Sequence, residues 1–373
     1  MDKKIIKKLY IALFVLVFIL PAPVYYAMKR YIDTHNYENR SIPEFPALSA
    51  ENYSSYPALV EEYIKNMLPF KNQIAKVNGI IDYKLVKDTM SHDVVIGKDG
   101  WLFYTGKQDI VEDPISDHTG VNLFSDEELD IISEKLKAAD ELMQQRGGRF
   151  LLVISPSKMS IYPDKLPDRF GAAAELKRID QLAGYLSKNT DICVVNAYET
   201  LKEYRASNPD QILFLKYDTH ENYAGSYISS QAIIDSLGYA PLPDISTLTL
   251  KENEDPEADL ANILGIRSSV SDPNNLTAVG YGKHELSFYM NEAETELRYT
   301  NTANDADHGK LMMVSDSFGE GMLPFLADHY NEAYMVYPRT FKAEMIEKEA
   351  PDVLIYQVTE RLLENLLKFD VAD

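Results

Sequence analysis

The chain begins with one apolar run flanked by basic residues. Residues 9–28 carry no charge, four lysines precede them and two basic residues follow. A helix of about 20 such residues spans the ~30 Å hydrocarbon core of a bilayer, and the preceding lysines predict a cytoplasmic N-terminus. We therefore expect residues 1–30 to form a cytoplasmic tip and a transmembrane anchor. The alternative is a cleaved signal peptide, which is disfavoured because Pro23 follows Ala22 and a tyrosine occupies a position that cleavage needs to be small.

Residues 31–90 show a weaker pattern. The stretch 31–60 has several prolines and little periodicity, so it is expected to be a stalk. Apolar residues then recur at helical spacing over 60–87, which predicts a helical segment leading into a folded domain, with breaks at Pro69 and Gly79.

From residue 91 to residue 373, short apolar runs alternate with amphipathic helical patterns. This alternation predicts an α/β domain with a mainly parallel sheet covered by helices on both faces. Residues 94–104 predict a hairpin, and polar sequence over 241–309 interrupts the rhythm, with a second hairpin expected near 284–289. The main predicted strands are 149–154, 192–195, 212–215, 311–314, 332–337 and 353–358, and the predicted helices are 125–146, 176–188, 222–237, 319–327, 342–349 and 360–369.

Composition narrows the function. There are 58 acidic and 37 basic side chains, a net charge of −21, which argues against nucleic acid as a partner because phosphate binding needs a basic patch. A hydrophobic fraction of 45% excludes a disordered acidic chain. The single cysteine, Cys193, excludes an intramolecular disulfide and a cysteine-rich metal site. Since no histidines and carboxylates recur at metal-ligand spacing, we expect no metal and no cofactor.

The first candidate for chemistry is Asp218 with His220, directly after the predicted strand 212–215. Ligands of open parallel sheets bind beyond the carboxyl ends of the strands. Residues two apart in an extended backbone point to the same side, so Asp218 is expected to orient the imidazole of His220, as the carboxylate of a Ser–His–Asp triad does.

The second candidate is Ser317, where a predicted strand turns into a helix within a few residues. The N-terminus of that helix supplies free N–H groups and a partial positive charge, which can hold an oxyanion. The alternative is that Ser317 only caps the helix, which is the commoner role of a serine at such a junction.

Six short segments carry a family resemblance. They are Glu38–Pro46, Leu68–Asn72, Gly97–Tyr104, Pro156–Lys158 with Ile161–Pro163, Tyr217–His220 and Ser315–Phe318. Their order and residues resemble the alginate O-acetyltransferase group of SGNH-hydrolase-like proteins and the related DHHW proteins. This sequence departs from the pattern at three positions, with Ser315 in place of Gly, Glu221 in place of Trp and Lys71 in place of Arg.

The resemblance implies an extracytoplasmic serine acyltransferase held at the cell membrane by a single span. Ser317 would be the nucleophile, His220 the general base and Asp218 its orienter. Acetyl groups would come from a membrane-bound O-acyltransferase, and the acceptor would be a hydroxyl of an exported or cell-surface polysaccharide. The alternatives are a carbohydrate acetylesterase with the same residues and a non-catalytic glycan-binding or assembly protein.

Four further residues are candidates for substrate binding: Lys158, Tyr162, Asn222 and Ser315. For Lys158 and Tyr162, which match a family motif, the alternative is a packed loop with a surface lysine. Ser315 is also a possible second serine at the same turn. Glu221 places a negative charge beside the proposed base, which predicts a raised histidine pKa or an altered choice of acceptor. The acidity of the whole chain favours a neutral or amino-bearing glycan over an anionic one.

Overall fold

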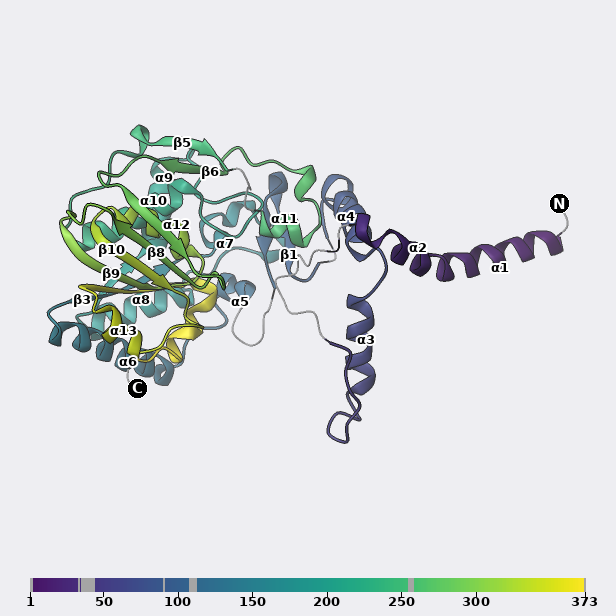
Figure 1. The fold of residues 1–373 in the computed structure, drawn as a ribbon, viewed down its shortest axis with the longest axis horizontal. Helices are drawn as coiled ribbons and strands as arrows, with labels where there is room; N and C mark the ends of the chain where they lie inside the picture. The colour runs from purple at the N-terminus through teal and green to yellow at the C-terminus, as the bar shows by residue number, and fades with distance from the viewer. Residues whose placement is uncertain are drawn as a thin grey trace. The chain divides into compact units, whose positions relative to one another are not determined.

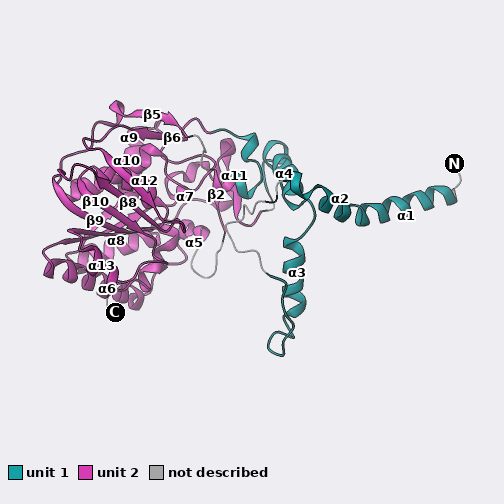
Figure 2. Cartoon of the chain, viewed as in Figure 1, with its two compact units in different colours: residues 1–89, 261–271 teal, residues 90–260, 272–373 magenta. Residues whose placement is uncertain are grey.

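The computed structural model describes residues 3–32, 34, 44–89, 91–106, 113–253 and 258–371. The chain divides into two compact units (Figure 2). One unit contains residues 1–89 and 261–271, and the other contains residues 90–260 and 272–373.

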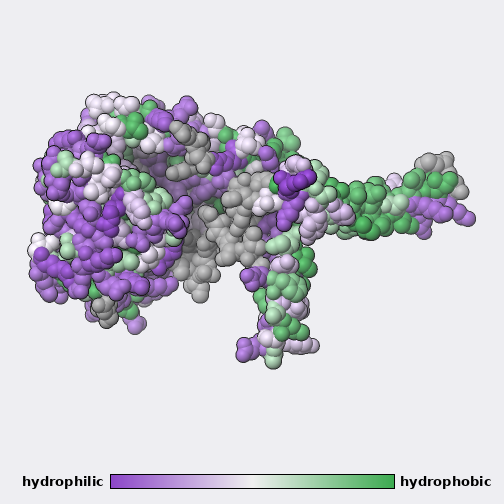
Figure 3. Space-filling model, in the orientation of Figure 1, coloured by the Kyte–Doolittle hydropathy of each residue, from purple (hydrophilic) through white to green (hydrophobic). Residues whose placement is uncertain are grey.

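The first unit is helical. Its N-terminal part, Lys4–Tyr31, is long and apolar enough to cross a membrane, and none of it is buried (Figure 3). This confirms the predicted apolar helix, while its retention as an anchor stays a prediction. The helices of this unit are α1 (Lys3–Ile19), α2 (Pro21–Met28), α3 (Tyr56–Asn66), α4 (Lys71–Ile81), a π-helical turn (Asp82–Val86) and two 3-10 turns (Lys29–Tyr31 and Arg267–Ser269).

The expected helix break at Gly79 is wrong. Helix α4 runs through this position, and a Cβ there would lie 1.8 Å from the carbonyl oxygen of Leu264. The glycine therefore permits a close backbone approach rather than ending the helix. The break at Pro69 is confirmed, since it lies between α3 and α4. Most of the segment Glu38–Pro46 lies outside the described residues.

The second unit is built on a seven-stranded sheet with the strand order β4-β3-β11-β9-β10-β8-β7 (Figure 1). The first five strands in that order are parallel, and β8 and β7 are added antiparallel at one edge. The mainly parallel sheet is therefore confirmed. The strands are β3 (Arg149–Ser155), β4 (Cys193–Asn196), β7 (Leu286–Met290), β8 (Glu296–Asn301), β9 (His308–Val314), β10 (Tyr330–Val336) and β11 (Val353–Thr359).

Helices cover both faces of the sheet, as expected. Figure 1 shows α9, α10 and α12 on one face, with α6, α8 and α13 on the other. The central strands are buried between these layers, and Leu151, Met313 and Ile355 are fully shielded from solvent. The helices are α5 (Pro114–Thr119), α6 (Asp126–Gln145), α7 (Lys158–Ile161), α8 (Arg178–Asn189), α9 (Ala197–Ser207), α10 (Tyr223–Leu237), α11 (Asp259–Ile263), α12 (Phe318–Ala327) and α13 (Glu344–Glu349).

Smaller elements complete this unit. The predicted hairpin at 94–104 is confirmed as β1 (Val94–Ile96) and β2 (Leu102–Tyr104), and the one near 284–289 forms the β7–β8 edge. A further two-stranded sheet pairs β5 (Thr249–Glu252) with β6 (Leu276–Val279). The 3-10 turns are Lys98–Gly100, Pro163–Lys165, Asp168–Phe170, Ile245–Thr247 and Glu360–Leu367.

The predicted strand at 212–215 is wrong. Its only ladder pairing is an isolated bridge between Phe214 and Glu221. Leu213 and Phe214 are fully buried, so the apolar run is a core segment. However, side chains rather than a neighbouring strand satisfy much of its backbone. An apolar run of this length does not by itself distinguish a buried strand from a buried loop.

Candidate active site

Ser317 stands at the turn between β9 and α12, but its hydroxyl does not cap the helix. The carboxylate of Asp316 takes that role, because its Oδ1 accepts from the N–H of Phe318 at 3.0 Å. The other oxygen, Oδ2, accepts from the N–H of Thr359 at 2.8 Å and ties the turn to the end of β11. The capping alternative for Ser317 is thus wrong, and its hydroxyl is available for another contact.

That contact is His220. The Oγ of Ser317 lies 2.7 Å from Nε2 of His220, and Nδ1 of the same ring lies 2.6 Å from Oδ1 of Asp218. The structure therefore brings the three predicted residues into one hydrogen-bonded chain. The side chain of His220 is 25% exposed and that of Asp218 only 3%. A ligand can therefore reach the His220 part of this hydrogen-bonded arrangement, whereas Asp218 is shielded from solvent.

The backbone reason for the Asp218–His220 contact differs from the expected one. Residues 216–220 form a turn and bends rather than an extended strand. In this turn, Oδ1 of Asp218 accepts from the backbone N–H of His220 at 3.0 Å as well as from its ring. Aspartate favours such local hydrogen bonds two residues on, which is why the pair meets without a strand.

Asp218 is held in its ionised form. Burial opposes ionisation, but the charge of His220 and hydrogen bonds from His220 and from the N–H of Asp259 outweigh it. Together they hold the pKa of Asp218 well below its ordinary value. A permanent carboxylate at this position fixes the tautomer of the imidazole and stabilises the imidazolium form.

Lys158 lies beneath the loop and does not line the cavity beside Ser317. Its Nζ donates to the carbonyl oxygens of Leu215, Lys216 and Asp218 at 3.1, 3.3 and 2.5 Å. Burial lowers the pKa of Lys158 to about 8, against the opposing charges of nearby aspartates. These contacts argue against the expected substrate contact and assign Lys158 to holding the loop.

Tyr162 and Ser315 are also buried, which argues against the substrate contacts expected of them. The Tyr162 hydroxyl accepts from the N–H of Leu213 at 2.9 Å, and its ring stacks on Trp101 at a centroid distance of 4.5 Å. The Ser315 hydroxyl donates to Oε1 of Gln357 and is fully shielded from solvent. Ser315 is therefore not an accessible second serine in this conformation.

Asn222 and Glu221 both line the cavity beside Ser317. The side-chain oxygen of Asn222 caps α10 by accepting from Ala224 and Gly225 at 3.0 and 3.1 Å. Burial raises the pKa of Glu221 to about 8, and the hydroxyl of Ser229 donates to its carboxyl group. The negative charge expected beside His220 is therefore largely absent at neutral pH.

Asp259 is the residue that the sequence analysis missed. Its carboxylate accepts from the N–H and the hydroxyl of Thr219 at 2.9 and 2.6 Å, and its own N–H donates to Oδ2 of Asp218 at 2.7 Å. Burial and the charge of Asp218 raise its pKa to about 7. The position lies within the polar stretch 241–309, and only the preference of aspartate for the start of a helix distinguishes it in the sequence.

Asp218, His220 and Asp259 also place potential metal-ligand atoms within 4.8 Å of one another. The atoms of Asp218 and His220 that face this point already hydrogen-bond to each other or to the N–H of Asp259. A cation would have to break those bonds, so the donor set fits a hydrogen-bonded triad better than a metal site.

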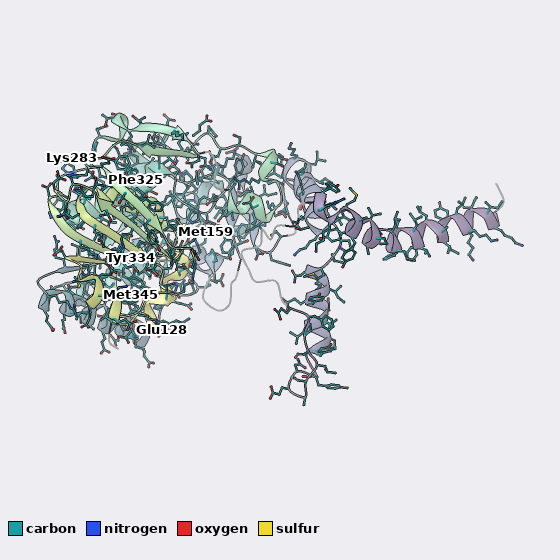
Figure 4. All side chains as sticks on the ribbon, in the orientation of Figure 1. Glu128, Met159, Lys283, Phe325, Tyr334 and Met345 are labelled. Atoms are coloured by element: carbon teal, nitrogen blue, oxygen red, sulfur yellow. The ribbon has the colours of Figure 1, made fainter. Side chains whose placement is uncertain are left out.

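A cavity of about 410 Å³ opens beside Ser317 and His220. A separate cavity of about 20 Å³ lies on the Thr219 side, where Lys158 and Arg361 line it. Phe325 of the larger cavity and Met159 of the smaller one are labelled in Figure 4.

The start of α12 leaves one backbone N–H group available as a donor. The N–H of Phe318 donates to Oδ1 of Asp316 and that of Gly319 to the carbonyl of Asp316, so the helix start uses both internally. Among the described residues, no acceptor is found for the N–H of Ser317. This narrows the expected set of oxyanion donors at the helix N-terminus to the N–H of Ser317.

Comparisons with known proteins agree with this architecture. Residues 94–327, more than half of the chain, match the family described as SGNH hydrolase-like domain, acetyltransferase AlgX. A probable alginate O-acetylase AlgJ of Pseudomonas syringae pv. tomato is 22% identical over 173 residues, which cover 46% of this chain and 40% of that protein. The chain thus spans less than half the length of this curated relative.

Two solved structures share the fold. Bacillus cereus PatB1, solved with a sulfonyl adduct, has a TM-score of 0.53 at 13% identity and covers 74% of this chain and 97% of its own. A DHHW family protein from Eubacterium siraeum has a TM-score of 0.54 at 12% identity and covers 76% of this chain and 98% of its own. At these identities the likeness concerns the fold alone.

Proposed function

Since the chain belongs to the family of SGNH hydrolase-like acetyltransferases represented by AlgX, we propose that it moves an acetyl group through Ser317 to a hydroxyl of an exported or cell-surface polysaccharide. The observation that carries this proposal is the hydrogen-bonded chain from Ser317 through His220 to Asp218 at the wall of a ligand-sized cavity. A serine and a base at this distance, with the base oriented by a third group, are the arrangement needed for nucleophilic catalysis.

The reaction has two half-steps. In the first, Oγ of Ser317 attacks the acetyl carbonyl while Nε2 of His220 takes the hydroxyl proton, and His220 returns that proton to the departing alcohol. In the second, His220 takes a proton from the acceptor hydroxyl, whose oxygen attacks the acetyl-serine. The ester is transferred to the sugar, and the serine regains its proton from His220.

The oxyanion that forms in each half-step lies at the N-terminus of α12. The N–H of Ser317 and the partial positive charge of this ten-residue helix stabilise that charge. Asp218 stays ionised throughout and stabilises the imidazolium.

The N-terminal apolar helix fits a protein that is anchored by one span and works outside the cytoplasm. A membrane-bound O-acyltransferase would then supply the acetyl group, as the family resemblance implies. The name of the alginate O-acetylase relative supports a polysaccharide acceptor without identifying it.

Product analysis tests this function with the full chain in detergent. Given an activated acetyl ester and a mixture of oligosaccharides, the wild type should yield acetylated sugar, and Ser317→Ala should reduce the yield at least about 10³-fold. Ser315→Ala is the matched control from the same turn, with its folding checked by thermal unfolding. Free acetate as the sole product would indicate an esterase, and no reaction with the wild type would support the binding-protein alternative.

A further inference from the structure

The chemistry of the large cavity indicates which glycan it accepts. Resting on the proposed transferase function, we propose that the acceptor sugar bound beside Ser317 carries no carboxylate or phosphate, and that Glu320 is a specificity-determining residue that disfavours anionic acceptors. The name of the Pseudomonas syringae relative contains alginate, a polyuronate, so the charge of this cavity distinguishes two classes of acceptor.

No lysine or arginine occurs among the described residues that line the cavity. The groups that face it are carboxyl, amide, hydroxyl and aromatic. The polar ones are Glu221, Asn222, Ser226, Asn253, Asn275, Thr277 and Glu320, and the aromatic ones are Tyr223, Tyr281, Phe318 and Phe325. Such a set suits sugar hydroxyls and the apolar faces of sugar rings.

Glu320 supplies the negative charge of the cavity lining. It lies on the first turn of α12, three residues after Ser317, and the hydroxyl of Tyr337 donates to its Oε1. Glu320 is exposed and is one of the residues that line the cavity. Glu221 adds a second carboxyl group deeper in the wall, which ionises only at higher pH.

The side-chain amides of the cavity are uncharged groups that can hydrogen-bond to a sugar. The Nδ2 group of Asn253 donates to Oδ1 of Asn275 at 2.6 Å, linking the ends of β5 and β6 at the cavity wall. Fixed amides of this kind offer both donors and acceptors to hydroxyl groups. They provide no compensation for the charge of a uronate.

Two cations near the triad line a different cavity. Lys158 and Arg361 line the separate small cavity on the Thr219 side, and Lys158 is already bound by three carbonyl oxygens. A uronate bound in the large cavity would therefore place its carboxylate near Glu320, with no lysine or arginine among the described lining residues to pair with it. A juxtaposition of like charges selects against such a ligand.

Acceptor competition tests this inference. The full chain in detergent is acetylated with an activated ester, and acetyl-enzyme is first quantified by intact mass. Transfer is then compared among oligosaccharides of equal length: cello-oligosaccharide, oligoglucosamine and oligomannuronate. We expect transfer to the neutral or the amino-bearing acceptor to exceed transfer to oligomannuronate by at least about tenfold, and the first two acceptors separate neutral from cationic recognition.

Reversing the charge at position 320 tests the role of Glu320 directly. Glu320→Lys should raise the ratio of oligomannuronate to cello-oligosaccharide transfer by roughly tenfold or more, and Glu320→Gln should have a smaller effect in the same direction. Glu134→Lys is the matched control, because Glu134 is an exposed glutamate of α6 on the opposite face of the sheet. It changes the net charge equally and should leave the ratio unchanged.

The outcomes separate this inference from the proposed function. Acetyl-enzyme that prefers oligomannuronate, or a ratio unmoved by Glu320→Lys, would overturn the inference alone and direct attention to the cavity lined by Arg361. A third outcome is that acetyl-enzyme forms but none of the three oligosaccharides is acetylated. If, in addition, none of them binds the Ser317→Ala variant in saturation-transfer NMR, the cavity is not an acceptor site. A failure to form acetyl-enzyme would overturn both proposals.

Discussion

The turn that carries Ser317 and the loop that carries His220 and Asp218 are joined by the Ser317–His220 hydrogen bond, yet their backbones are held by different means. The Ser317 turn joins β9, a fully paired central strand, to α12, and Asp316 fastens it to β11 from within the same turn. The loop at 213–220 has one isolated bridge, and side chains from distant parts of the sequence hold it.

Three residues distant in sequence hold this loop: Lys158 from α7, Tyr162 just after it and Asp259 from α11. Lys158 and Tyr162 contact backbone groups of the loop, and Asp259 contacts both a backbone N–H group and the orienting carboxylate. The nucleophile is thus positioned by regular secondary structure, and the base is positioned by tertiary contacts. The base should therefore be easier to displace by substitutions remote from the reacting atoms.

The largest expected effect in the loop comes from Asp218→Asn. This change keeps the size of the side chain but removes the charge that fixes the tautomer of His220, so acetyl transfer should fall roughly 10³-fold to 10⁴-fold. Rates of acetyl-enzyme formation, followed by intact mass, would measure it. A variant within a few-fold of the wild type would show that the Asp218–His220 bond has no catalytic role.

Next in size is Lys158→Met, which removes one ammonium and its hydrogen bonds to three carbonyl oxygens, those of Leu215, Lys216 and Asp218. Of these, the Lys216 carbonyl still accepts from the N–H of Leu102. We expect a loss of about 3 kcal/mol in the free energy of unfolding, because hydrogen bonds to charged groups contribute about 1.5–3 kcal/mol, and a fall in rate of about 10²-fold. Urea unfolding and ester turnover measure the two quantities.

Lys137→Met, at an exposed site on α6, is the matched control for that change and should be neutral in both assays. If Lys158→Met lowered stability and left the rate intact, the loop would not depend on this clamp for its catalytic geometry.

Asp259→Asn should have a smaller effect on the rate, a fall of about tenfold. It should also change how the free energy of unfolding depends on pH. The folded pKa of Asp259 is about 7 against an ordinary value of 3.8. Between these values the folded state binds the proton more tightly than the unfolded chain, so this group makes the free energy of unfolding fall as pH rises from about 4 to about 7.

The Asn variant lacks that contribution, and its stability should decline less over the same pH window. Urea unfolding at several pH values measures the slope. Identical slopes in the wild type and the variant would contradict the assignment of a raised pKa to Asp259.

The smallest effect belongs to Tyr162→Phe, which removes the acceptor of the Leu213 N–H and keeps the ring that stacks on Trp101. One buried donor without a partner costs about 1–3 kcal/mol, and the rate should change only a few-fold. Thermal unfolding and ester turnover measure both. Tyr289→Phe, an exposed tyrosine of β7, is the control, and an equal loss of stability there would argue against a specific role for the Tyr162 hydroxyl.

The contrast between the Ser317 turn and the loop that carries His220 also explains which features could be predicted from the sequence. The strand–helix alternation and the serine at the β9–α12 junction follow from local patterns that the sheet preserves. The apolar run at 212–215 predicts a strand, but the burial of Leu213 and Phe214 that such a run indicates does not fix backbone pairing.

The roles of Lys158, Tyr162 and Asp259 depend on contacts between residues tens of positions apart in the sequence. For Lys158 and Tyr162, the motif resemblance located the residues without giving them a role, whereas their burial indicates support of the loop. Asp259 stood in a polar stretch with no motif, so a local pattern could at most have marked it as a helix start.

Peptide mapping of the trapped intermediate tests the central claim most directly. The full chain is exposed briefly to an activated acetyl ester, quenched in acid, digested and analysed by tandem mass spectrometry. The account predicts acetyl on Ser317, its absence from Ser317→Ala, and no acetyl on Ser315 of the same peptide. Acetyl on Ser315, or on a lysine with Ser317 unmodified, would contradict the assignment of Ser317 as the nucleophile.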